Sequence, residues 1–574
     1  MIPYWTSFVQ SCGVIRVRSI LRVTISKRQT FQFSSMKRKH NEEEISFAKR
    51  LRGTTMATAT VVLTPRESQL RNLLLDVANF VNESKDIEKK VELRWAGGWV
   101  RDKLLGIQSH DIDIAINVMT GQNFGLKVRE YLEDAENLKK HGLEAKDVKK
   151  LYKIAANPEK SKQLETATTN IFQFDVDFVN LRKETYTEDS RNPEMEFGTA
   201  EEDALRRDAT INALFYNLHT DILEDFTGGL ADMKAKLIKT PLEPYTTFKD
   251  DPLRVLRLIR FASRLDFKID SEAEDCMSNP AIMEALRLKI SRERVGVEVE
   301  KMLKGNNPWL SLNYFDRLGI YSTIFTDPTA HEIPAPDTSS WRIVYDCLKE
   351  MTLNETPDSI YKSLVRSDDA KYLAWILAAL APWTAIPPAQ AAKPGGKTPP
   401  PYGALVAREG LKAESKLCNM VAGAFKQYAE ITELKDAIKR NDSYVHERDT
   451  VGMMIRKWES HGGQWKLQVL FALLVESLKL ESSEVSPEYR TLFSEWQKFI
   501  DHLKDLDVME APAIRGIVDG KILSKALGVK PGIWMAPALN VCMEWQLRNP
   551  DSTDTEAAIE EVRKRKEELN IPQK

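Results

Sequence analysis

Two aspartates in an apolar run, Asp111 and Asp113, are the residues of this chain with the clearest potential for chemistry. They stand in the segment Asp-Ile-Asp-Ile-Ala-Ile, which alternates as a β-strand does. Both carboxylates should therefore point to one face, while Ile112, Ile114 and Ile116 point into the core. Two carboxylates on one strand face can bridge a pair of Mg²⁺ ions about 3.5–4 Å apart. The pattern predicts metal-assisted phosphoryl or nucleotidyl transfer, with both aspartates as catalytic metal ligands.

A pair of glycines, Gly97 and Gly98, precedes this strand and is followed by Trp-Val-Arg101-Asp. A Gly-Gly turn that opens a helix lets backbone N–H groups approach an anion, and the helix dipole favours negative charge there. Taken alone, an Asp-x-Asp pair is more often a strand end, and a Gly-Gly pair is more often a plain turn. Together and in this order, they predict a phosphate cradle beside a metal site.

The combination Gly-Gly-x-Val-Arg-Asp, a spacer and Asp-x-Asp resembles the CCA-adding tRNA nucleotidyltransferases of the class shared by bacteria and eukaryotes. The resemblance implies an α/β head with a polymerase β-like nucleotidyltransferase palm, followed by an all-α neck, body and tail. It implies a reaction in which tRNA receives C, C and A from CTP and ATP without a template, with Mg²⁺ as the cofactor. Backbone amides near Gly97 and Gly98, together with Arg101, would then hold the phosphates.

A second block, Arg206–Asn212, matches the family's Arg-Arg-Asp-x-x-x-Asn pattern. Asp208 and Asn212 are four residues apart, so a helix would place them on one face. The resemblance implies that Arg207, Asp208 and Asn212 contact the triphosphate and ribose of the incoming nucleotide. In isolation, an ordinary amphipathic helix with a charged start would explain the same residues.

A third block, Asp225-Phe-Thr-Gly228-Gly229, resembles the family's hinge between head and neck. Two glycines allow positive φ angles and a change of domain angle. A plain turn explains them almost as well.

Three arginines recur at every third position of an otherwise apolar helix, namely Arg254, Arg257 and Arg260. Buried arginines are costly without a partner. The spacing therefore predicts a negatively charged or hydrogen-bonding ligand, and we assign all three to nucleotide binding.

Asp251 and Arg254 are candidates for reading the base. Cytosine and adenine each present an amino donor beside a ring-nitrogen acceptor, whereas guanine and uracil present a carbonyl beside an N–H. An aspartate that accepts and an arginine that donates would select C and A, at about 1–3 kcal/mol for a misdirected pair. Alternatively, Asp251 followed by Pro252 is a helix N-cap with proline at the first helical position. The family more often has Glu where this chain has Asp250, a departure that we expect to matter little.

A fifth block, Lys289–Glu298, resembles the family's last motif and is expected to brace the neck, with Ser291 as the helix N-cap. The segment Phe172–Arg182 alternates as another palm strand. Its Asp175 or Asp177 is a candidate third carboxylate, which would accept the proton of the attacking hydroxyl.

Between these blocks, the polar segment 184–199 corresponds to a mobile loop of the family that takes part in the switch from C to A addition.

Length and composition are typical of a multidomain protein without a disulfide framework. The chain has 574 residues, a net charge of −2 and five scattered cysteines without metal-ligand spacing. Any RNA-binding surface must therefore be a local basic patch. No apolar run reaches the roughly 20 residues that span a bilayer, and no membrane or obligate protein partner is expected. The expected parts are a targeting segment 1–55, a head 56–235, a neck 236–305, a body 306–430 and a tRNA-binding tail 431–574.

The first residues have the composition of a mitochondrial transit peptide, since no acidic residue occurs before Glu42 while Arg and Lys recur among Ser, Thr and apolar residues. Met36 begins a basic cluster, and Lys49–Arg52 forms a second, which is typical of a nuclear signal or a solvated arm. We expect a mitochondrial form from Met1, and cytoplasmic or nuclear forms from Met36 or Met56.

Beyond about residue 300 the pattern is mainly helical. Pro382–Gly403 is rich in Pro, Ala and Gly and is expected to be a loop without regular structure inside the helical body. Near the end, Asp519–Gly532 resembles the tail element with which the family holds the tRNA elbow. Lys521, Lys525 and Lys530 are its candidate phosphate contacts.

Two other functions fit parts of this pattern. A poly(A) polymerase carries almost the same head motifs but would use ATP alone on many RNAs. An inactive RNA-binding protein on the same scaffold is disfavoured by the intact Asp-x-Asp, Arg-Arg-Asp-x-x-x-Asn and Asp-Asp-x-x-Arg blocks.

Overall fold

The computed structural model describes residues 61–84, 89–144, 167–185, 194–329, 333–387, 398–481 and 486–572. The expected targeting segment 1–55 and the start site at Met56 lie outside these ranges. Residues 186–193, in the expected mobile loop, also lie outside them.

A six-stranded mixed sheet forms the centre of the head, in the order β3-β4-β2-β1-β7-β8. β2 and β4 run parallel, whereas the other neighbouring pairs are antiparallel. The strands are β1 (Leu93–Ala96), β2 (Asp111–Ile116), β3 (Ala167–Ile171), β4 (Phe174–Asn180), β7 (Leu214–Asn217) and β8 (Ile222–Asp225). The sheet confirms the predicted α/β head.

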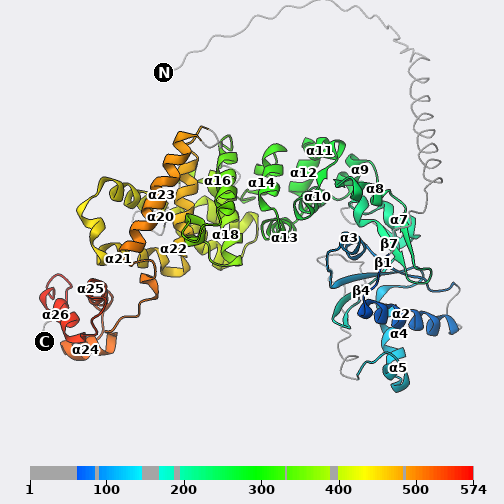
Figure 1. Ribbon diagram of the computed structural model, residues 1–574, viewed down its shortest axis with the longest axis horizontal. Helices are drawn as coiled ribbons and strands as arrows, with labels where there is room; N and C mark the ends of the chain where they lie inside the picture. The colour runs from blue at the N-terminus through cyan, green and yellow to red at the C-terminus, as the bar shows by residue number, and fades with distance from the viewer. Residues whose placement is uncertain are drawn as a thin grey trace, which may run out of the picture. The chain divides into compact units, whose positions relative to one another are not determined.

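Two helices, α2 (Pro65–Glu83) and α4 (Gly121–Leu132), lie against one side of this sheet (Figure 1). Phe124 of α4 packs on Phe178 of β4 with ring centroids 5.5 Å apart. The isoleucines of β2 at positions 112, 114 and 116 are all buried, as the alternation predicts. The aspartates of β2 are therefore directed to the opposite side of the sheet.

The predicted strand Phe172–Arg182 is wrong at its start. Phe172 and Gln173 have φ angles of 53° and 70° and form a two-residue turn, because Ile171 of β3 pairs with Phe174 of β4. Positive φ at both central residues gives a hairpin turn the twist that matches the flanking strands. Neither residue is the Gly or Asn that normally indicates such a turn, so the alternating pattern gave no warning of it.

Shorter elements complete the head. An antiparallel ribbon of β5 and β6 enters the expected mobile loop 184–199 at both ends. The remaining head elements are α3 (Gly98–Leu104), α5 (Ala135–Lys140), β5 (Arg182–Thr185), β6 (Glu194–Phe197), α7 (Ala200–Leu205), the 3₁₀ helix η1 (Thr210–Asn212), α8 (Gly229–Lys234) and β9 (Leu237–Ile238).

The neck is built around α10 (Leu253–Leu265), whose apolar residues are buried and which packs on α13 (Arg292–Leu303) and α14 (Pro308–Arg317). Its elements are α9 (Pro244–Asp250), α10 (Leu253–Leu265), β10 (Lys268–Ile269), α11 (Ser271–Met277), α12 (Pro280–Lys289) and α13 (Arg292–Leu303). At the start of α13, the buried Arg292 donates to the backbone carbonyls of Gly410, Thr323 and Ile324. The buried guanidinium of Arg292 thereby links the neck to the helices that follow.

The rest of the described chain is helical, which confirms the all-α prediction. Its helices are α14 (Pro308–Arg317), α15 (Tyr321–Ile324), α16 (Trp341–Leu353), α17 (Ile360–Leu364), α18 (Asp368–Leu380), η2 (Ala381–Ala385), α19 (Tyr402–Leu405), η3 (Val406–Gly410), α20 (Ser415–Arg440), η4 (Ser443–His446), α21 (Arg448–Glu459), η5 (Ser460–Gly462), α22 (Trp465–Ser477), α23 (Pro487–Asp505), η6 (Ala511–Ala513), α24 (Gly520–Leu527), α25 (Met535–Arg548) and α26 (Thr555–Lys564). Among the described helices, none combines the length and the apolar character that crossing a bilayer requires.

One expectation for this region needs correction. Pro382–Gly403 does hold regular structure at both ends, since η2 and α19 enter it and contact each other and the body helices. Proline is tolerated in the first turn of a helix, so proline content alone did not exclude these short helices. The expected division into body and tail stays a prediction, and its bound at residue 430 falls inside the continuous helix α20.

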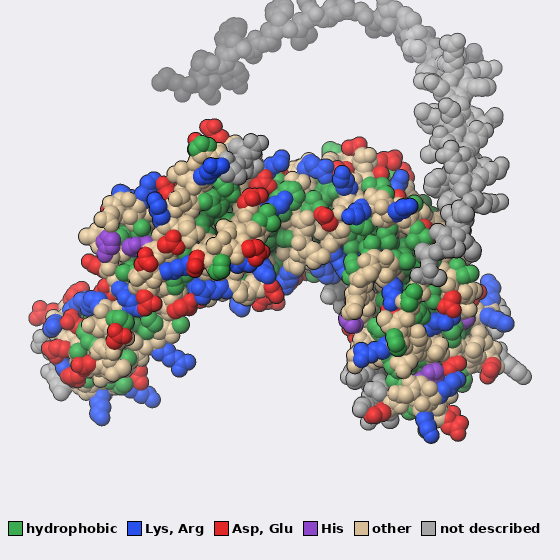
Figure 2. Space-filling view, viewed as in Figure 1, with side chains coloured by type: hydrophobic (Ala, Val, Ile, Leu, Met, Phe, Trp, Pro, Cys, Tyr) green, Lys and Arg blue, Asp and Glu red, His purple; other side chains and the backbone are tan. Residues whose placement is uncertain are grey.

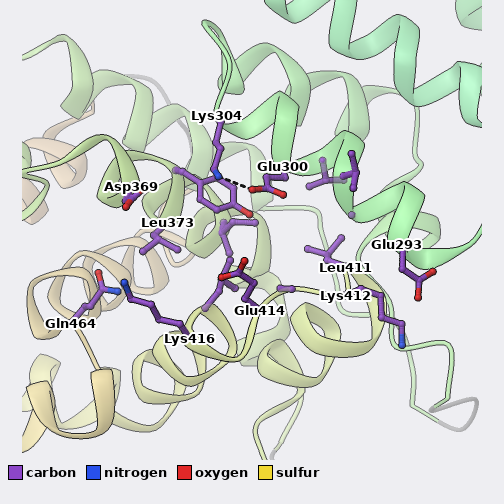
Figure 3. Close-up of a pocket in the computed structure, with 17 residues that line it drawn as sticks. Glu293, Glu300, Lys304, Asp369, Leu373, Leu411, Lys412, Glu414, Lys416 and Gln464 are labelled. Atoms are coloured by element: carbon purple, nitrogen blue, oxygen red, sulfur yellow. Dashed lines mark hydrogen bonds and ion pairs between the residues drawn. The ribbon is translucent and has the colours of Figure 1, made fainter. Parts of the chain in front are cut away.

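A cavity of about 300 Å³ lies between α13, α18 and the segment 411–417 (Figure 3). At the edge of the cavity, Lys304 donates to Glu300, and Nζ of Lys304 lies 4.9 Å from the ring centroid of Tyr372. None of the predicted site residues lines this cavity.

Candidate active site

The two predicted metal ligands, Asp111 and Asp113, lie on one face of β2, the first exposed and the second half-buried. The parallel register with β4 places Asp175 beside Asp111 and Asp177 beside Asp113. Residues paired in register on neighbouring strands point to the same face. Four carboxylates from two strands therefore share this side of the sheet.

Burial and crowding of like charges raise the pKa of Asp113. Burial is the largest cause, Asp177, Asp111 and Asp203 add to it, and the Arg207 guanidinium opposes it. A bound cation would favour the ionised form of Asp113 and offset the repulsion from the neighbouring carboxylates.

The donors on this face fit a hard divalent cation, because all of them are carboxylate oxygens. In the described part of the chain, no three His, Cys, Asp or Glu side chains are already gathered as a metal site. Asp111 and Asp113 would supply two ligands. Small divalent cations are commonly held by one or two carboxylates, with substrate phosphates and water completing the coordination.

The two candidates for a third carboxylate are held differently. Asp175 is exposed and accepts from the Asn170 amide at 2.8 Å. Asp177 is half-buried and accepts from the Thr168 hydroxyl. The role of a third catalytic carboxylate stays a prediction for either residue. The strand register makes Asp177 the neighbour of Asp113.

Gly97 occupies a position that excludes a side chain. Its φ is 67°, and a Cβ atom there would lie 2.8 Å from Nη1 of Arg207 and 3.6 Å from Oδ2 of Asp113. The Gly97 amide donates to the carbonyl of Leu214 at 3.1 Å. The amides of the first turn of α3, from Gly98 onward, are those that helix geometry leaves for an anion.

The predicted helix over Arg206–Asn212 is wrong. α7 ends at Leu205, and Ala209 has extended backbone with φ −140° and ψ 144° before the short η1 begins. Asp208 and Asn212 nevertheless meet, because the Asn212 amide donates to Oδ1 of Asp208 at 3.1 Å. The turn brings together the pair that a helix would also have aligned.

Asp203, which the sequence analysis missed, holds the two arginines of this block. Its buried carboxylate accepts from Nε of Arg206 at 2.9 Å and from Nε and Nη2 of Arg207 at 3.0 and 2.9 Å. Burial alone would raise the pKa of Asp203, but Arg207 and Arg206 outweigh it and lower the pKa. The three- and four-residue spacing to the arginines was the signal that could have identified it.

Asp208 is the carboxylate that joins this block to the neck. Arg257 of α10 donates through Nε to Oδ2 of Asp208 at 2.5 Å. Burial opposes ionisation, yet the Arg257 guanidinium and the Asn212 amide hold the pKa of Asp208 well below its usual range. In turn, Asp208 raises the pKa of Arg257.

The other two arginines of α10 also have protein partners. Arg254 donates through Nη2 to the Arg206 carbonyl at 2.6 Å, and Arg260 donates through Nε to Oε2 of Glu298 at 2.6 Å. Arg254 is buried, whereas Arg257 and Arg260 are only partly buried, and protein carboxylates already compensate the charges of these two. Nucleotide contact by the three arginines stays a prediction.

Asp251 lies at the start of α10 and supports the helix start, while its role in reading the base stays a prediction. Its Oδ1 accepts from the Leu253 amide at 3.2 Å, although the N-cap position itself is Pro252, one residue later than the alternative placed it. Its Oδ2 lies 3.5 Å from Nη2 of Arg294 on α13. Arg294 and Glu298 place the fifth block against α10, and Ser291 holds the N-cap position of α13.

Arg101 is enclosed in protein and 3% exposed. It donates to Oδ1 of Asp102 through Nε and Nη2, at 2.8 and 2.6 Å, and to Oδ1 of Asn212 through Nη1 at 2.6 Å. Burial lowers the pKa of Arg101, against the opposing effect of Asp102. Its predicted contact with phosphate stays a prediction.

In the third block, the carboxylate of Asp225 accepts from the amides of Gly228, Gly229 and Leu230 at 2.9, 3.0 and 3.0 Å. Gly228 has a φ of 83°, and a Cβ on Gly229 would lie 2.3 Å from the Thr210 carbonyl oxygen. The two glycines therefore serve a tight start of α8. Their role as a hinge stays a prediction.

In the tail, Lys521 and Lys525 lie one turn apart on α24 and line a shallow hollow of about 670 Å³. Lys530 follows in the turn before α25, and all three lysines are exposed. Figure 2 shows Lys and Arg side chains around the segment that holds α24. Contact with RNA stays a prediction for all three.

Comparison with known proteins gives one family match and two extensive relatives. The model of the poly A polymerase head domain matches residues 93–239. The chain is 48% identical over 557 residues to the nucleotidyltransferase lcsQ of Purpureocillium lilacinum, covering 89% of this chain and 93% of that protein. It is 38% identical over 516 residues to the mitochondrial CCA tRNA nucleotidyltransferase of Saccharomyces cerevisiae, covering 86% of this chain and 92% of that protein.

Solved structures agree at the level of the fold. The Thermotoga maritima CCA-adding enzyme complexed with tRNA superposes with a TM-score of 0.56 at 20% identity, covering 88% of this chain and 96% of that chain.

We expect Asp113→Asn to stabilise the fold while it weakens metal binding. The raised pKa of Asp113 means that its stabilising contribution is present below the unfolded pKa and lost as pH rises through the folded pKa. At neutral pH without metal, the amide should therefore raise the unfolding temperature, and the gain should vanish in acid. Mn²⁺ affinity, measured by calorimetry, should fall more than about 100-fold, beyond the loss seen for outer partners of a metal ligand. The exposed Asp551→Asn serves as the control, and an unchanged Mn²⁺ affinity in Asp113→Asn would contradict the assignment.

Proposed function

Since the chain belongs to the family of CCA-adding tRNA nucleotidyltransferases, we propose that it adds C, C and A in turn to the 3′ end of tRNA. CTP and ATP are the substrates, no nucleic-acid template is used, and pyrophosphate is released. The observation that carries the proposal is the aspartate pair of β2 on one side of the sheet, with Asp113 and Arg207 both beside Gly97.

In the proposed reaction, the tRNA 3′-oxygen forms a bond to the α-phosphorus, and the bond from that phosphorus to the bridging oxygen of pyrophosphate breaks. The hydroxyl proton passes to a carboxylate, Asp177 or Asp175, or to water. Mg²⁺ held by Asp111 and Asp113 would, when bound, activate the hydroxyl and stabilise the leaving charge.

The side chains around the sheet would orient the nucleotide. Arg207, whose Nη1 lies beside Gly97, and Arg101 would hold the triphosphate together with amides of the α3 turn. Asp208 and Asn212 would position the ribose. Asp251 and Arg254 would accept from the amino group and donate to the ring nitrogen of C or A, while Arg257 and Arg260 support them from the same helix.

Incorporation of each labelled nucleotide into tRNA lacking its 3′ end tests this function. We expect two C and then one A, no G or U, and nothing when EDTA removes the metal. A long A tail added to many RNAs would instead identify a poly(A) polymerase. No incorporation by folded protein would leave a binding function.

The tail lysines are proposed to bind phosphates of tRNA. Replacing Lys521, Lys525 and Lys530 by Ala should weaken tRNA binding and lower the slope of log affinity against log salt by about 1 for each lysine that binds a phosphate. Exposed lysines elsewhere give a matched control, namely Lys416, Lys426 and Lys498 replaced together by Ala. Equal salt slopes in the two triple variants would exclude the tail site.

We propose that residues 1–55 direct the protein to mitochondria, and that forms beginning at Met36 or Met56 stay in the cytoplasm and nucleus. The transit-like composition supports this, as does the S. cerevisiae relative, which is named as mitochondrial. Fluorescent fusions that start at Met1 and at Met36 should distribute differently in cells. Identical distributions would refute the proposal.

A further inference from the structure

A chain of polar contacts runs from α3 of the head to α10 of the neck. Asp102, which is 3% exposed, accepts from Arg101, whose Nη1 donates to Asn212 at 2.6 Å. The Asn212 amide donates to Asp208 at 3.1 Å, and Arg257 of α10 donates to the other oxygen of Asp208. Five side chains thus link the two helices through the turn that carries Asp208.

A second, direct contact closes this chain into a ring. Arg264, near the end of α10, donates through Nη2 to Oδ2 of Asp102 at 3.1 Å. Arg257 and Arg264 are seven residues apart, which is about two helical turns, so both face the head. One helix is therefore held by two buried head carboxylates, Asp208 at its middle and Asp102 at its end.

The ring of Phe261 lies among the same guanidinium groups and is 4% exposed. Its centroid is 5.8 Å from Cζ of Arg101, 5.4 Å from Cζ of Arg257 and 4.5 Å from Cζ of Arg260. Stacked arginines around a buried aromatic ring are attracted to its faces and lose freedom to move. Both arrangements oppose rotation of α10 against α3.

We infer that Arg264 and Asp102 are positioning residues, which fix the angle between base-reading helix α10 and the phosphate-binding turn of α3. The head holds the triphosphate and α10 holds the base, so this angle decides where the α-phosphate lies relative to the tRNA end. A displacement of about 1 Å at the reacting atoms can cost 10²-fold in rate. The kinetic part of this inference rests on the proposed function.

Arg264→Met is the decisive variant. The Arg264 side chain is 42% exposed, and Asp102 keeps Arg101 as its partner, so the fold should persist. Because both groups that bind the nucleotide remain, KM for CTP and ATP should change less than about threefold, while kcat falls about tenfold or more. Arg264→Lys should restore most of the rate, because one N–H of Arg264 makes the contact.

Arg317→Met is the matched control. Arg317 also joins two helices through a single ion pair, with Glu274 at 2.8 Å, and its side chain is 50% exposed. Its replacement should leave kcat unchanged. If Arg264→Met retains the wild-type kcat, or if its decrease in rate only follows the fraction of folded protein, the positioning role is refuted.

A distance measurement tests the same inference without any activity. Spin labels at Leu126 on α4 and Leu288 on α12, which are 53% and 71% exposed, report the head–neck separation in the full chain. The distance distribution should broaden in Arg264→Met and narrow again in Arg264→Lys. An unchanged distribution would overturn the inference even if the wild-type protein adds CCA, whereas a broadened one would support it even if the proposed function failed.

Discussion

The buried carboxylate of Asp208 is the contact on which the arrangement of head and neck depends. It accepts from Asn212 in its own turn and from Arg257 of α10, and these partners keep it ionised despite burial. Removing one partner of a buried pair leaves an uncompensated charge, at a cost of about 3–5 kcal/mol. The turn after α7 and the neck helix are therefore coupled by electrostatics as well as by apolar packing.

Buried carboxylates of the head fall into two groups, whose pKa values are shifted in opposite directions. Asp203 and Asp208 are surrounded by arginines, which lower the pKa of both carboxylates. Asp113 lies among like charges and its pKa is raised. A carboxylate whose ionised form is destabilised in this way is characteristic of functional sites, where a bound ligand relieves the repulsion between like charges.

The arginines of α10 show how burial can be misread. Their spacing suggested a ligand, because an unpaired buried guanidinium is costly. Arg257 and Arg260 instead pair with Asp208 and Glu298, so their charges also hold the neck together. Asp251 likewise caps α10 with one oxygen and lies near Arg294 with the other. The residues proposed to read the base therefore also support the neck, and a decrease in activity in a variant does not distinguish the two roles.

The sequence by itself determined the features that depend on local periodicity. Alternation over Asp111–Ile116 placed both aspartates on one face, and the order of the motif blocks indicated the family and the α/β head followed by helices. Tertiary structure alone decided which residues meet. It broke the helix expected over Arg206–Asn212, set Asp177 beside Asp113 through the parallel register, and joined Asp102 to Arg264 across 162 positions of the chain. Side-chain periodicity is set by neighbouring residues, whereas strand register and ion pairing are set by the packing of distant segments, for which a single sequence carries no local signal.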